Sequence, residues 1–125
     1  MKIYVCGNPL LKEDSIALKI AKKLSKKLKE VDFEEFEAIE DLDESVVYIM
    51  DVVKGIRKVK LIEDFDVVKT DKIFSLHDYD LSYEIKLLKK IGKIKKVFLI
   101  AIPFSKNEKK IVKEVEDQIH LILRK

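Results

Sequence analysis

Two carboxylates and one imidazole are the side chains of this sequence whose types and positions could do chemistry. Asp14 ends the polar stretch GNPLLKED, Asp51 closes the apolar run SVVYIM, and His77 lies in the polar segment SLHD. A mixed set of oxygen and nitrogen ligands suits a borderline divalent metal such as nickel or zinc. The same groups could instead do acid/base work, in which one carboxylate activates a water molecule.

Each of these residues also has a simpler structural interpretation. Asp14 could cap a helix, a position at which Asp is strongly preferred. Asp51 could accept a hydrogen bond from the backbone of a following turn, and His77 could be a loop histidine with no functional role. We interpret the three together as one site, because common alternative signatures are missing. The GNPLLKED stretch lacks the glycine pattern of a dinucleotide loop and the GK[ST] ending of a phosphate loop, and no serine lies in a nucleophile elbow.

The elements that must position these residues alternate between strands and helices. Apolar runs rich in β-forming residues predict strands over 2–6, 45–50 and 95–103. Two weaker strands are expected, an irregular one near a sheet edge over 32–39 and a half-exposed one over 57–63. Apolar residues at helical spacing predict helices from 14 to about 28, over 81–91 with Gly92 as the C-cap, and from 107 onward.

This order predicts an α/β three-layer sandwich of phosphorylase/hydrolase-like type, with an open, mostly parallel sheet and helices on both faces. A chain of 125 residues without an internal repeat or linker is expected to form a single domain over 1–125. In such folds ligands bind at the carboxyl ends of the strands, near the point where the strand order reverses. Asp14, Asp51 and His77 are all expected at that edge.

The net charge and the amino-acid composition exclude some classes of function and indicate the kind of source organism. The 26 basic and 23 acidic residues nearly cancel to +3, which argues against a dedicated nucleic-acid binder. Lys and Glu abound while Asn8, Asn107 and Gln118 are the only side-chain amides, a bias typical of thermophilic and archaeal proteins.

The localisation signals point to the cytoplasm. Cys6 is the only cysteine, so no internal disulfide can form, which fits a reducing compartment. The longest apolar run, VFLIAIPF, is far shorter than the roughly 20 residues of a membrane span, so no membrane association is expected. Gly7, Asn8 and Pro9 interrupt the apolar start too early for a signal peptide.

The opening VCGNPLLKEDSIALKIAKKL resembles the start of the hydrogenase maturation endopeptidases. Those enzymes remove the C-terminal extension from the large subunit of nickel–iron hydrogenases after nickel insertion. The resemblance implies that Asp14, Asp51 in YIMDVV and His77 in SLHDYDL face the nickel. Ser75, two residues before His77, also matches the family's preference for Ser or Thr, and VFLIAIP is similar to the family's penultimate strand.

The resemblance further implies that nickel arrives with the substrate, a precursor of a hydrogenase large subunit, and that no organic cofactor is needed. Because neutral imidazole is the ligand form, activity is expected to fall below histidine's reference pKa of about 6.5. His120, between Ile119 and Leu121 in the terminal helix, is expected to have a structural or surface role.

Two alternatives remain open at this point. One is a relative that binds a hydrogenase subunit without cleaving it. The other is a flavodoxin-like signalling module such as a receiver domain, in which Asp51 would be the phospho-acceptor and Lys106 would follow a late strand. Receiver domains, however, place an acid pair directly after strand one, where this chain has Cys6, Gly7 and Asn8.

Overall fold

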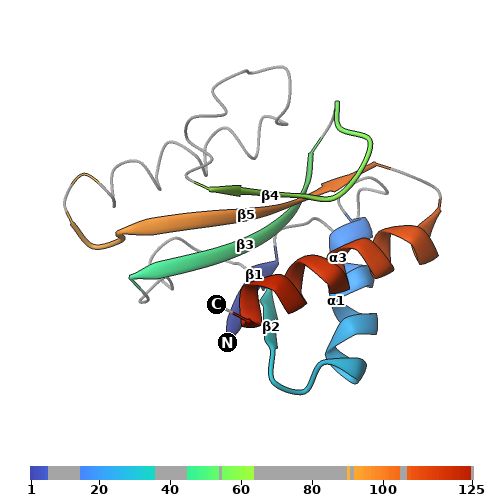
Figure 1. The fold of residues 1–125 in the computed structure, drawn as a ribbon, viewed down its shortest axis with the longest axis horizontal. Helices are drawn as coiled ribbons and strands as arrows, with labels where there is room; N and C mark the ends of the chain where they lie inside the picture. Colours follow the sequence, from blue (N-terminus) through green and yellow to red (C-terminus); the bar gives the residue numbers. More distant parts are fainter. Residues whose placement is uncertain are drawn as a thin grey trace.

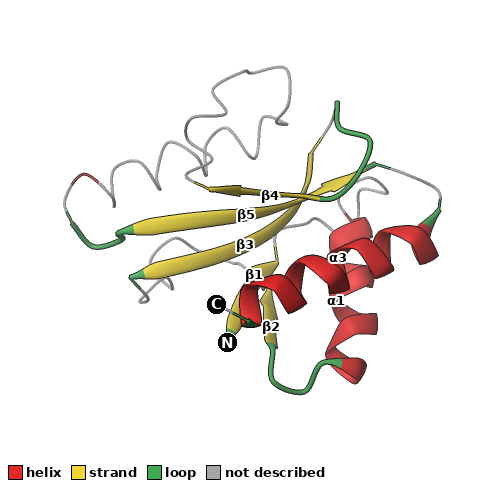
Figure 2. Cartoon of the chain, in the orientation of Figure 1, coloured by secondary structure: helices red, strands yellow, loops and turns green. Residues whose placement is uncertain are grey.

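The computed structural model describes residues 1–5, 15–35, 45–53, 55–63, 90, 92–104 and 107–124. Five strands and two long helices lie in these ranges (Figures 1 and 2). The strands are β1 (Lys2–Val5), β2 (Asp32–Glu35), β3 (Val46–Val53), β4 (Lys60–Glu63) and β5 (Lys96–Pro103). The helices are α1 (Ser15–Lys27) and α3 (Glu108–Leu123).

The strands form one sheet in the order β2-β1-β3-β5-β4. The pairs β1–β2, β1–β3 and β3–β5 are parallel, whereas β4 runs antiparallel along β5. The prediction of an open, mostly parallel α/β sheet is therefore confirmed. The irregular second strand lies at an edge, as expected, and its burial is correspondingly low.

The central pair of strands is the longest and most buried. β3 and β5 pair over their whole length, from Val46 opposite Lys96 to Val53 opposite Pro103. Continuous apolar runs suit them because strands in the middle of a parallel sheet are covered on both faces. The expectation that Asp51 closes its strand is wrong, since Val52 and Val53 continue the pairing with β5 for two further residues.

Both described helices cover the same face of the sheet (Figure 1). Their apolar stripes meet alternate residues of the three central strands in one core. This core is made of Ile3, Val5, Ala17, Ile20, Ala21, Leu24, Leu28, Val31, Met50, Val52, Val59, Ile100, Ile102, Ile111, Val115, Ile119 and Ile122. The helix predicted over 81–91, which would cover the opposite face, lies outside the described residues apart from the helical Lys90. Gly92 has a φ of 83°, the left-handed conformation that a C-cap glycine adopts.

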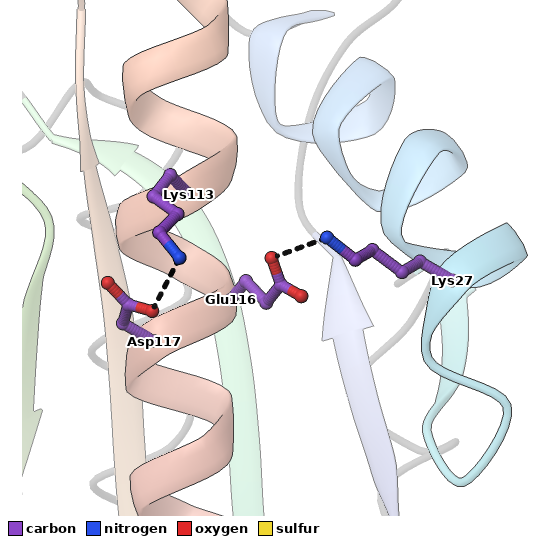
Figure 3. Close-up of polar contacts among 4 residues, drawn as sticks. All are labelled: Lys27, Lys113, Glu116 and Asp117. Atoms are coloured by element: carbon purple, nitrogen blue, oxygen red, sulfur yellow. Dashed lines mark hydrogen bonds and ion pairs between the residues drawn. The ribbon is translucent and has the colours of Figure 1, made fainter.

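Ion pairs join the two helices beside this core. Lys27 Nζ of α1 lies 3.0 Å from Glu116 Oε1 of α3, whose side chain is buried (Figure 3). A second pair joins Lys23 Nζ to Glu108 Oε1 at 3.2 Å. The start of α3 at Asn107 was also predicted correctly, and the Asn107 side chain accepts a hydrogen bond from the Lys110 N–H.

Neither helix in the described part of the chain combines the length and apolar character needed to cross a membrane.

Candidate active site

Asp51 lies at the point where the strand order of the sheet reverses. From β1 the chain continues to β2 on one side and then to β3 on the other, so the reversal falls between β1 and β3. Among the described residues, β1 and β3 pair as far as Val5 and Met50, and Asp51 is the next residue of β3. In open α/β sheets this crevice, at the carboxyl ends of the strands, is where ligands bind.

The Asp51 side chain is buried and held by the adjacent backbone. Its exposed fraction is 4%, and Oδ1 accepts a hydrogen bond from the Val52 N–H at 2.8 Å. This contact lies within the strand, not in a turn after it, so the simpler structural interpretation is correct only in part. A hydrogen bond to a carboxylate is stronger than one between neutral groups, and it restricts the directions in which Asp51 can present its oxygens.

Asp51 projects from the sheet face opposite α1 and α3. Its neighbours Met50 and Val52 belong to the core shared with these helices, and successive side chains of a strand point to opposite faces. Asp51 pairs with Ala101 of β5, and Ala101 pairs in turn with Lys60 of β4. The three side chains therefore form one row across this face, with a small residue in its middle.

The sequence alone did not single out Ala101 or Lys60. The alternation in RKVKLIE indicates which residues of the strand share a face. Only the register between the strands shows that this face is the one bearing Asp51.

The other predicted site residues lie outside the described part of the chain. Asp14 precedes the first residue of α1 in the sequence, and His77 and Ser75 fall within the range 64–89. Their convergence with Asp51 therefore stays a prediction. The described residues themselves contain no group of three or more His, Cys, Asp or Glu side chains placed to hold a metal ion.

His120 is part of the last turn of α3. It is half-buried, and its carbonyl accepts a hydrogen bond from the Arg124 N–H at 3.2 Å. This position agrees with the expected structural or surface role.

Solved structures of peptidases share this fold over almost the whole chain. HybD, a hydrogenase maturating endopeptidase from E. coli, is similar with a TM-score of 0.72 and 18% identity, over 99% of this chain and 93% of HybD. A solution structure of an endopeptidase from Escherichia coli gives 0.70 and 19%, over 99% and 93% of the two chains. Hydrogenase 2 maturation peptidase from Thaumarchaeota archaeon SCGC_AB-539-E09 gives 0.50 and 20%, over 99% and 97%. No curated protein matches the chain at the level of sequence.

The sequence of this chain also matches the model of a protein family. The family model described as hydrogenase maturation protease (HycI) matches residues 20–125. This range contains Asp51 and His77, whereas Asp14 lies before it. The match decides against the receiver-domain alternative, which belongs to a different family. By this match over most of its length, the chain belongs to the hydrogenase maturation protease family, a family of peptidases.

Proposed function

We propose that this protein removes the C-terminal extension from the precursor of a nickel–iron hydrogenase large subunit after nickel has been inserted. The observation that carries the proposal is the buried carboxylate of Asp51 at the reversal of strand order, in a chain whose family is that of the hydrogenase maturation proteases. The similarity to HybD over 99% of this chain, with a TM-score of 0.72, supports a fold of the same type.

In this proposal the nickel is part of the substrate and is recognised by Asp14, Asp51 and His77. Carboxylate and imidazole groups are suitable ligands for such a borderline metal. Asp51 would contribute an oxygen whose direction is restricted by the Val52 N–H. A carboxylate held in advance loses little conformational freedom on binding, so it can position the precursor accurately.

Nickel recognition would make cleavage conditional on metal loading. A precursor without nickel would lack the atom that the three side chains contact, and its scissile peptide would not be held in register. We place the reaction in the cytoplasm. Cys6 is the single cysteine of the chain, so folding requires no internal disulfide and therefore no oxidising compartment.

The test is incubation of the purified protein with nickel-loaded and nickel-free precursor, followed by mass spectrometry of the large subunit. We expect loss of the C-terminal extension only from the loaded precursor. Asp14→Asn, Asp51→Asn and His77→Ala should each abolish the mass change while the variants remain folded by circular dichroism. Asp32→Asn, an exposed aspartate of the edge strand β2, is the matched control and should cleave normally.

The outcomes also separate the remaining alternative. If the protein binds the loaded precursor without changing its mass, it is a non-catalytic relative. Normal cleavage by the Asp14 and His77 variants would instead show that the site residues are wrong.

A further inference from the structure

In the described part of the connection from β3 to β4, residues 55–59, together with the first residue of β4, three cations are exposed: Arg57, Lys58 and Lys60. We refer to these three residues as the cationic turn. In Figure 1 this turn, drawn in green, follows the carboxyl end of β3, the end near which Asp51 lies. The cationic turn therefore borders the edge of the sheet at which the candidate site lies.

The strand register places Lys60 in the same row as Asp51. Lys60 pairs with Ala101, and Ala101 pairs with Asp51. Residues directly opposite each other in neighbouring strands project to the same face. Since strands are about 4.8 Å apart, the backbones of Asp51 and Lys60 are separated by roughly 10 Å, with Ala101 of β5 as the intervening residue of the row.

The backbone of the cationic turn is fixed from the opposite side. Val59 is 5% exposed and belongs to the core formed with α1 and α3. Its N–H donates a hydrogen bond to Glu114 Oε2 of α3 at 3.0 Å. The turn also contains Gly55 at a φ of 89°, a conformation that side-chain-bearing residues rarely adopt. Anchoring through Val59 leaves the flanking Lys58 and Lys60 directed to solvent.

The cationic turn forms no ion pair within the described ranges of the chain. Lysines elsewhere pair with carboxylates, as Lys2 does with Glu34 and Lys96 with Glu63. None of the ion pairs among the described residues includes Arg57, Lys58 or Lys60. Glu114 is engaged with the Val59 N–H on the α3 side. A surface with three such cations attracts negatively charged groups, most strongly at low ionic strength.

We propose that the cationic turn docks an acidic segment of the substrate polypeptide, beside the face that carries Asp51. This proposal rests on the proposed peptidase function and adds the chemistry by which the polypeptide is held. Carboxylates paired with these exposed cations would speed the association of the segment and fix its orientation, and at low salt they would also strengthen its binding. The scissile peptide would thus be aligned by contacts away from the reacting atoms.

The first test measures binding of a fluorescein-labelled peptide of alternating glutamate and alanine by fluorescence anisotropy. We compare the wild type with Lys58→Glu/Lys60→Glu and with the control Lys93→Glu/Lys95→Glu, which makes the same charge change at two exposed lysines before β5. We expect the control to bind like the wild type. The Lys58/Lys60 variant should bind at least about tenfold more weakly at low salt.

Three results would overturn the proposal. One is equal binding by the two charge-reversal variants. Another is equal binding of a peptide in which glutamine replaces glutamate. The third is tighter binding of a labelled oligothymidylate than of the glutamate peptide, which would make the cationic turn a nucleic-acid surface. Lys58→Gln/Lys60→Gln, which only removes charge, provides the same comparison if the reversal variant does not fold.

The second test uses the nickel-loaded precursor as substrate. The Lys58/Lys60 variant should show a raised KM with kcat unchanged, because the lost contact is made equally before and during reaction. A lowered kcat at unchanged KM would contradict docking. Absence of cleavage by the wild type would count against the peptidase function. The peptide-binding comparison would still test whether the cationic turn binds acidic segments.

Discussion

Asp51 of β3 lies directly opposite Ala101 of β5, so the carboxylate and the methyl group leave the sheet on the same face. Ala101 is fully buried, and any larger side chain there would press on the space around Asp51. We predict that Ala101→Val lowers the free energy of unfolding by about 1–3 kcal/mol through overpacking. It should also reduce cleavage of the loaded precursor at a temperature at which the variant is fully folded.

Ala17→Val is the matched control for this prediction. Ala17 is equally buried but belongs to α1 and to the core on the opposite face. It should show a comparable loss of stability with normal cleavage. Equal cleavage by both variants would mean that the space beside Asp51 plays no part in the reaction.

The hydrogen bond between Asp51 and the Val52 N–H predicts different effects for two substitutions of Asp51. Asn can still accept this hydrogen bond, so Asp51→Asn should change the free energy of unfolding by less than about 1 kcal/mol. Asp51→Ala leaves a buried N–H without its partner and should cost about 1–3 kcal/mol. Urea denaturation measures both values. If both variants lost the same stability, the hydrogen bond would not be what holds the carboxylate.

The sheet could be predicted from the sequence because its central strands carry continuous apolar runs, whereas α1 and α3 have apolar residues at helical spacing. The end of β3 was placed too early. A carboxylate after the apolar run SVVYIM resembles a strand end, but pairing with Ile102 and Pro103 continues the strand beyond it. Pairing with β5 therefore determines where β3 ends, and the polarity of the local sequence does not show this end.

Asp51 could be proposed as a site residue because a charged side chain at the end of a buried strand is uncommon. The row of Asp51 with Ala101 and Lys60 was not predictable. It depends on the register of the antiparallel strand β4 against β5, and that register is set by the partner strand and the connecting turn as well as by the residues of β4. The expected meeting of Asp51 with Asp14 and His77 remains a prediction.

Two ion pairs of α3 should differ in their value for stability. Lys27 pairs with Glu116, whose side chain is 8% exposed, whereas Lys113 pairs with Asp117, whose side chain is 57% exposed (Figure 3). Lys27→Met leaves a buried carboxylate without its cation, so we expect a loss of about 1–2 kcal/mol. Lys113→Met should cost less than about 0.5 kcal/mol, as exposed helix pairs do. Chemical denaturation of both variants checks this, and equal losses would contradict the role of burial.

Thermal unfolding should show the high stability that the composition indicates. Only three of the 125 side chains are amides, and ion pairs join separate elements, including Lys23 with Glu108 and Lys27 with Glu116. The cost of desolvating charged groups falls as temperature rises, so such pairs contribute more in hot conditions. We therefore predict a Tm above about 65 °C, beyond the usual range of mesophilic domains. Scanning calorimetry measures it, with Lys23→Met/Lys27→Met as the test variant and Lys109→Met/Lys110→Met, two exposed lysines of α3, as the control. The test variant should lose more stability near its Tm than the control does. A wild-type Tm within the mesophilic range, or equal losses in the two variants, would show that these ion pairs do not adapt the protein to heat.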